Sequence, residues 1–181
     1  MVNKILILTI ITLLGLVSCV EKQNFDQLDD LFIEPTIEGS ILYVEAPEDV
    51  FNQPIVGGSV SQDFNFDGFN EDIFADRVLE GFIIYEIENT TSKELDLTVE
   101  FLDEAKLILD TMYIHVDPGP TATVEKEVAY GGASGKNIEI IKNTSSIRVH
   151  VQNLGDNTSV SNLPDPKIIF RSMGEFTMRI R

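Results

Sequence analysis

The chain has 181 residues, 43% of them hydrophobic, which suits one globular domain and is too apolar for a disordered chain. Its 30 acidic residues outnumber 13 Lys and Arg, so the formal net charge at pH 7 is −17. An excess of this size repels phosphate backbones, which argues against nucleic acid as a partner and favours cations or basic protein surfaces.

The first 18 residues have the composition of a removable export signal. A single cation, Lys4, precedes an unbroken apolar run from Ile5 to Leu14. This run is shorter than the roughly 20 apolar residues that a membrane-spanning helix needs. The sequence therefore predicts that residues 1–18 are a signal peptide.

The end of this segment resembles the lipobox of bacterial lipoproteins. Leu16-Val17-Ser18 stands directly before Cys19, the only cysteine in the chain. The resemblance implies acylation of the Cys19 thiol, cleavage before Cys19 and acylation of the new amino group, with fatty acids such as palmitate. Val20 stands where an Asp would resemble an inner-membrane retention signal, so the resemblance implies the outer membrane, in either leaflet. An ordinary secretory signal or a short anchor helix is the alternative.

The acidic segment 19–37 shows no sustained hydrophobic period and is predicted to be a flexible tether with a span of roughly 25 Å. Residues 38–181 are expected to form a single domain of strands separated by turns. The clearest two-residue alternation lies at 95–101, which predicts a strand with one face in a core and the other in water. The expected strands cover residues 39–46, 55–66, 79–89, 95–101, 106–116, 121–130, 147–152, 167–172 and 175–180.

Short helices are expected at Asn70–Val78 and Gly135–Lys142, and a turn or bulge at Met173-Gly174. Closely spaced short strands with turns between them predict an all-β protein, an antiparallel β-sandwich. The segment 81–116, a strand, NTTSKE, a strand, LDEAK and a strand, resembles small immunoglobulin-like or fibronectin-like domains of exported bacterial proteins. That resemblance implies an immunoglobulin-like sandwich and carries no function.

One local pattern resembles the front half of a calcium-binding loop. Oxygen-bearing side chains alternate at Asp63, Asn65 and Asp67, and Gly68 and Glu71 follow. The twelfth position of such a loop, normally a bidentate Glu, is Phe74 here. A half-buried strand whose polar face carries Asp and Asn explains the same pattern without calcium. No other cofactor is indicated.

Catalytic motifs are weak. His115 and His150 are the only imidazoles, neither belongs to a metal-spaced pair, and no GxSxG or HExxH occurs. The segment from Gly131 to Lys136 departs from the phosphate-loop signature, because three residues separate the glycines and Asn137 follows the lysine. The sequence thus predicts a protein that is not an enzyme, although a cluster of carboxylates around either histidine would favour a hydrolase.

The charge is unevenly distributed along the chain. From Cys19 to Asp117 there are 24 acidic and 4 basic residues, and from Pro118 to Arg181 there are 6 acidic and 8 basic residues. One interpretation is that C-terminal strands with arginines pair with acidic strands in the same sheet. The other is an acidic face for docking. The arginines concerned are Arg148, Arg171, Arg179 and Arg181.

Together these features predict a membrane-anchored envelope lipoprotein that acts as a binding or scaffolding module, with the membrane and a basic envelope protein as partners. An assembly or transport accessory with an apolar ligand cavity is one alternative. A calcium-dependent surface-binding protein and a carboxylate-based hydrolase are the others.

Overall fold

The computed structural model describes residues 32–53, 59–69, 71–120 and 122–180. The signal segment, Cys19 and most of the expected tether lie outside these ranges. In the described ranges no helix is long and apolar enough to cross a bilayer. Residues from Ile33 to Ile180 form one unit, which contains all the labelled strands.

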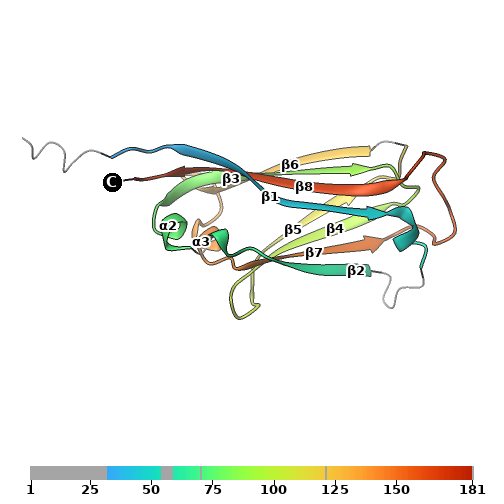
Figure 1. The fold of residues 1–181 in the computed structure, drawn as a ribbon, viewed down its shortest axis with the longest axis horizontal. Helices are drawn as coiled ribbons and strands as arrows, with labels where there is room; N and C mark the ends of the chain where they lie inside the picture. Colours follow the sequence, from blue (N-terminus) through green and yellow to red (C-terminus); the bar gives the residue numbers. More distant parts are fainter. Residues whose placement is uncertain (1–31, 54–58, 70, 121, 181) are drawn as a thin grey trace, which may run out of the picture. The chain divides into compact units, whose positions relative to one another are not determined.

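Alternating apolar and polar residues produce eight strands in the described chain (Figure 1). The strands are β1 (Thr36–Pro47), β2 (Ser59–Asn65), β3 (Val78–Asn89), β4 (Leu95–Leu102), β5 (Ile108–Val116), β6 (Ala122–Gly131), β7 (Ser146–Asn153) and β8 (Lys167–Met178). The helices are single turns, namely the 3-10 turns η2 (Glu48–Val50) and η3 (Asp67–Phe69) and the α-helical turns α2 (Asp72–Ala75) and α3 (Glu139–Lys142).

The strands pair into two four-stranded antiparallel sheets stacked face to face (Figure 1). The first sheet has the order β1-β8-β3-β6 and the second has the order β2-β7-β4-β5. Only β4 and β5 are consecutive strands that pair, and every other connection between labelled strands passes from one sheet to the other. Eight strands connected in this way form a jelly roll.

The antiparallel β-sandwich predicted from the sequence is confirmed, but its strand order is not immunoglobulin-like. In that fold several consecutive strands pair within one sheet, as A and B do. Here the segment between Asn89 and Leu95 crosses between the sheets, so β3 and β4 do not pair. The Asn89 side chain fixes this crossing, because its oxygen accepts the Thr91 N–H and its amide donates to the Lys93 and Asp117 carbonyls.

Several element boundaries differ from those predicted. β8 is one continuous strand rather than two, because Met173 and Gly174 pair with both β1 and β3. β1 begins at Thr36, and Ile33 bridges Ile180, so ordered pairing starts inside the segment expected to be a tether.

Both helices are shorter than predicted. The helix expected at Asn70–Val78 is confined to α2, because Val78 already pairs with Met178 in the first sheet. The helix expected at Gly135–Lys142 is confined to α3, because Lys136 is held against the end of β6 by a hydrogen bond from its N–H to the Ala129 carbonyl.

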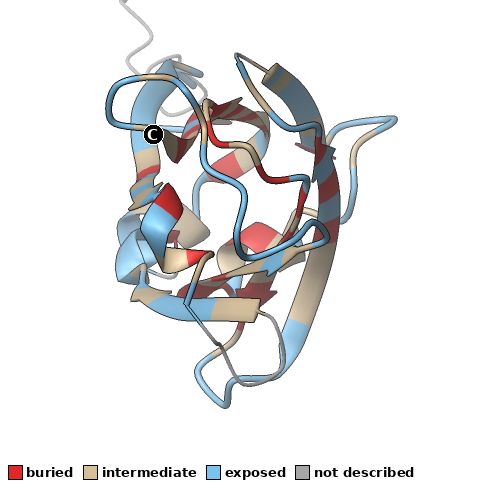
Figure 2. Cartoon of the chain, turned by 90° about the vertical axis from the view of Figure 1, so that its right-hand side faces the viewer, coloured by how far each residue is buried: buried red, intermediate tan, exposed pale blue. Residues whose placement is uncertain are grey.

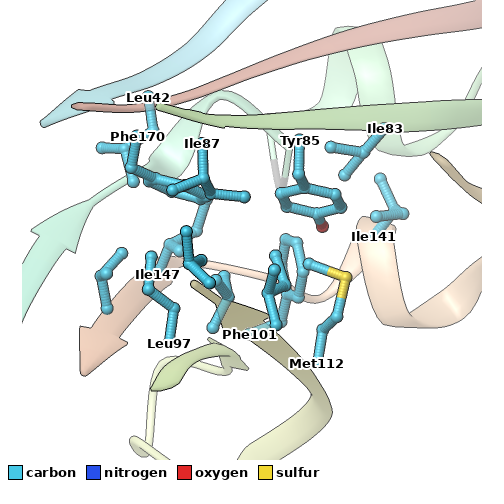
Figure 3. Packing of buried hydrophobic residues seen from close by; sticks show 14 of the residues in the cluster. Leu42, Ile83, Tyr85, Ile87, Leu97, Phe101, Met112, Ile141, Ile147 and Phe170 are labelled. Carbon is cyan, nitrogen blue, oxygen red and sulfur yellow. The ribbon is translucent and has the colours of Figure 1, made fainter. Parts of the chain in front are cut away.

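The core lies between the two sheets, as Figure 3 shows. Ile83, Tyr85 and Ile87 point inward from β3 and meet Leu97 and Phe101 of β4. All five are at most 1% exposed. Fully burying a side chain of this size contributes roughly 1.5–3 kcal/mol, so this interior face is the main source of stability.

An aromatic cluster closes the core near α2. The Phe69 ring lies 4.6 Å from Phe66, 5.3 Å from Phe74 and 5.4 Å from Phe176, measured between ring centroids. Phe176 fits because Gly81 and Gly174 leave space for its ring, where an added Cβ would come within 2.4 and 2.5 Å of it. Phe66, Phe69 and Phe74, which lie in and next to the calcium-like pattern, therefore pack together in the core.

A second cluster, which we call the polar latch, ties the loops together at the opposite end of the sandwich. Buried Glu48 accepts the Ser92 N–H with one carboxylate oxygen (2.6 Å) and the Ser161 N–H with the other (2.8 Å). Lys93, also fully buried, donates to the Ser159 carbonyl at 2.7 Å. Figure 2 looks at this end and shows buried stretches within the loops.

Candidate binding face

The calcium-like residues are used differently in the fold. Asp63 lies on β2 and accepts two hydrogen bonds from Arg148, at 2.6 and 3.0 Å, and these hold the pKa of its carboxyl below the usual value. The Asn65 amide donates to Asp67, so its nitrogen rather than its oxygen faces that carboxylate. Glu71 caps α2 through its backbone.

In the parts of the chain that the structure describes, no three His, Cys, Asp or Glu side chains are arranged to hold a metal ion. The glycine-rich segment after β6 is a tight turn, in which Gly131 and Gly132 have positive φ angles of 76° and 61°. Lys136 ends this turn and its ammonium bonds both oxygens of Asp110, at 2.8 and 2.6 Å. In a phosphate loop the lysine ammonium contacts the ligand, whereas here the Lys136 ammonium is paired with a carboxylate of the protein itself.

The two histidines lie on the outward face of the second sheet, and one of them has carboxylate neighbours. His115 Nδ1 lies 2.7 Å from Asp96, and Nε2 lies 3.6 Å from Glu94 and 3.7 Å from Asp117. The His115 side chain is half-exposed, so water screens these contacts. A histidine with carboxylate neighbours is the arrangement expected to favour a hydrolase, and His115 and Asp96 both line a hollow of about 330 Å³ on this face.

We expect the pKa of His115 to lie above 6.5, because Asp96 hydrogen-bonds the imidazole and the neighbouring carboxylates favour its charged form. The stabilisation that results is present below the pKa of the unfolded chain and is lost as pH rises through the folded-state pKa. NMR titration of the imidazole signals checks this, and Asp96→Asn should lower the pKa. Glu104→Gln, at the far end of β4, should leave it unchanged, whereas a wild-type pKa at or below 6.5 would contradict the assignment.

Arg148 and Arg171 pair with acidic residues of adjacent strands, as one interpretation of the charge asymmetry predicted, and Arg179 pairs with an acidic residue just outside the strands. Arg148 bonds Asp63 and Glu100, Arg171 bonds Glu86, and Arg179 bonds Glu34. Arg181 lies outside the described residues. These ion pairs neutralise only a few of the 30 acidic residues.

Most of the remaining acidic strand residues lie on the outward side of the first sheet, a surface we call the glutamate face. Inward residues such as Ile83 and Tyr85 are buried, so their neighbours in the strand point outward. The outward glutamates on the described strands of this sheet are Glu38, Glu45, Glu80, Glu86, Glu88, Glu125, Glu127 and Glu175. Their cations are Lys167 and Arg171, which leaves an excess of six negative charges.

The outward side of the second sheet has a different balance. Its acidic strand residues are Asp63, Asp96 and Glu100, and Arg148 bonds two of these three. Among the outward residues of the described strands, the acidic excess therefore lies on the first sheet.

Two pairs of glutamates oppose each other directly across the glutamate face. Glu38 pairs with Glu175 between β1 and β8, and Glu86, which also bonds Arg171 on its other side, pairs with Glu125 between β3 and β6. Like charges directly opposite destabilise a sheet, by an amount similar to the 0.2–1 kcal/mol that favourable pairs contribute. This repulsion is a cost to folding that a binding role would explain.

Replacing Glu175 with Lys should therefore raise the free energy of unfolding by roughly 0.5–1 kcal/mol, because Lys would face Glu38 with opposite charge. Urea denaturation at low and high salt measures the gain, which should shrink as salt screens the pair. Glu104→Lys makes the same charge change in a loop. Equal stabilisation by the two variants would mean that only net charge matters.

The members of the glutamate face cannot be recognised from the sequence, because they are far apart in the chain. Glu38 and Glu175 are brought together only by the pairing of the first strand with the last. The available signal was the alternation of Glu with Tyr and Ile at 85–88, which marks one polar side of β3 but does not show which strands flank it.

The sequence matches no protein-family model and no curated protein. Solved structures with a similar arrangement include a candidate secreted protein from Parabacteroides distasonis, with 13% identity and a TM-score of 0.45 over 65% of this chain and 37% of that one. They also include infectious bursal disease virus VP2, in a subviral particle (12%, 0.37, 84% and 33%), and desmodium yellow mottle tymovirus (6%, 0.36, 82% and 90%). The chain thus spans only about a third of the first two. With TM-scores below 0.5, these likenesses carry no conclusion about function or location.

Proposed function

We propose that this protein is a lipid-anchored envelope protein that binds a basic protein surface through the glutamate face and performs no chemistry of its own. The observation that carries the proposal is the set of eight outward glutamates on one sheet, two pairs of which oppose each other directly. A cationic partner would relieve this repulsion, so binding would remove an unfavourable electrostatic interaction that destabilises the free protein.

The proposed partner is a protein surface rather than a metal ion. The glutamates extend over all four strands of the sheet and do not converge on one point. A field of one sign spread over a face steers an oppositely charged partner and raises its association rate, in a manner that salt suppresses. A basic protein surface has the matching charge and extent.

Anchoring at Cys19 is the second part of the proposal, and it rests on the signal segment and the lipobox resemblance alone. Two or more acyl chains would hold the protein stably on a membrane. Mass spectrometry of the native N-terminal peptide should find Cys19 acylated and residues 1–18 removed, and Cys19→Ser should release the protein from the membrane fraction. An unmodified Cys19 would contradict the anchor without affecting the binding face.

Binding is tested with the full-length protein in detergent and a labelled lysine–serine peptide as the probe. Combined replacement of Glu38, Glu125 and Glu175 by Gln should weaken binding about tenfold, a loss of about 1.4 kcal/mol. It should also flatten the dependence of binding on salt. The matched control, Asp49→Asn with Asp76→Asn and Glu104→Gln, removes the same charge away from the face and should bind nearly as wild type does. Equal loss in both variants would overturn the proposal.

A further inference from the structure

The glutamate face has an apolar centre. Ile84 of β3 pairs with Met173 of β8, both pointing outward, and Met173 is 42% exposed. Phe82, next outward along β3, is half-buried. Glutamates surround this centre: Glu86, Glu127 and Glu175 lie one strand or one outward position away, and Glu38 lies diagonally across from Met173. The face therefore offers apolar surface as well as charge.

A hollow of about 410 Å³ opens over this apolar centre. Its floor is formed by Ile84 and Met173, and Glu38, Glu86 and Arg171 lie around it. It exists because the adjacent edge strand carries the small residues Gly39 and Ser40 opposite Gly174 and Met173.

A register irregularity of β1 lies directly beside this hollow. The pairing of β1 with β8 shifts between Ser40 and Leu42, and the additional residue, Ile41, packs against the core. Bulges re-aim side chains at sheet edges, and this one turns Leu42 as well as Ile41 toward the core, so that Tyr43 takes the next outward position, opposite Arg171.

Resting on the proposed function, we infer that the partner is a cationic amphipathic segment, which inserts an apolar side chain into the hollow and places its Lys or Arg side chains against the surrounding glutamates. A purely polar cation would satisfy the carboxylates and leave Met173 and Ile84 in water. A buried apolar anchor within a charged rim is the usual anatomy of an interface hot spot. The charge of the rim determines that the segment is basic.

The test compares two labelled peptides with the same lysines, one with leucines at helical spacing and one with serines in their place. Wild-type protein should bind the leucine peptide about tenfold more tightly than the serine peptide. Ser40→Phe places a ring over Met173 and should reduce binding of the leucine peptide to the level of the serine peptide. Ser61→Phe makes the same change at an exposed outward position of β2, the edge strand of the second sheet, and should have no effect.

Urea denaturation establishes that each variant is folded, and Met173→Gln removes the apolar floor without adding bulk should Ser40→Phe fail to fold. Equal affinity for both peptides, or a leucine preference that survives both Ser40→Phe and Met173→Gln, would overturn the inference and leave the proposed function standing. If neither peptide binds wild-type protein at low salt, the proposed function itself is overturned.

Discussion

Replacing Glu48 with Gln should lower the free energy of unfolding by about 2–3 kcal/mol, although the side chain keeps its size. The two Glu48 carboxylate oxygens accept backbone N–H groups from Ser92 and Ser161, which belong to different loops. An amide has a single acceptor oxygen, so one of these N–H groups would face an NH₂ group and lose its partner. Urea denaturation followed by tyrosine fluorescence measures the change, since the chain has no Trp.

The pH dependence of the stability of Glu48→Gln distinguishes the loss of the carboxylate charge from a change in packing. Burial raises the pKa of Glu48, but hydrogen bonds from Ser92 and Ser161 outweigh it, and the pKa lies below its ordinary value of 4.5. A depressed pKa contributes stability above the unfolded-state pKa that is lost as pH falls through the folded-state pKa. The difference between wild type and Glu48→Gln should therefore shrink in acid.

The control for this prediction is Asp49→Asn, which makes the corresponding change at the next, exposed position. It should alter stability by less than about 0.5 kcal/mol. If the two variants lose similar stability, the polar latch does not hold the loops.

Replacing Phe176 with Ala should cost about 3–5 kcal/mol, the range seen when large aromatic side chains are removed from a core. Its ring stacks edge-on against Phe69 and Phe74, with centroids 5.4 and 5.2 Å away, and occupies the space that Gly81 and Gly174 leave. The backbone on both sides cannot collapse into the resulting cavity without breaking the pairing of β3 with β8.

Phe82→Ala provides the comparison, because Phe82 is half-buried and points outward from β3. It should cost roughly 1 kcal/mol, in proportion to the smaller area that it buries. Thermal and urea unfolding of both variants measure the difference. A loss for Phe176→Ala no larger than that for Phe82→Ala would contradict the role of the aromatic cluster in closing the core.

Local pattern was sufficient to predict the strands, and the reason is visible at 95–101. There Leu95, Leu97 and Val99 are all at most 1% exposed and alternate with half-buried polar residues. Alternation with a period of two depends only on which face of a strand is buried, and it does not depend on which strand lies beside it. It also explains why the predicted bounds of most strands lie within a few residues of those observed.

Pairing was not predictable by the same means, because it depends on contacts between distant segments. The glutamate face requires β8 to lie between β1 and β3, which no local pattern indicates. Burial of Glu48 and Lys93 was also missed, since charged residues are almost always exposed unless they find partners. These partners are backbone groups and, for Lys93, also the Asp156 carboxylate, and they lie in separate loops. The calcium-like pattern failed to reveal that Asp63 pairs with Arg148, a residue on another strand.

The most direct test of the binding face is an NMR titration of isotope-labelled protein with the lysine–serine peptide at low salt. We predict that backbone amide shifts concentrate on outward residues of β1, β8, β3 and β6, such as Glu38, Glu86, Glu125 and Glu175, and disappear at high salt. Shifts concentrated on the outward residues of β4, β5 and β7, or no shifts at any peptide concentration, would contradict the account.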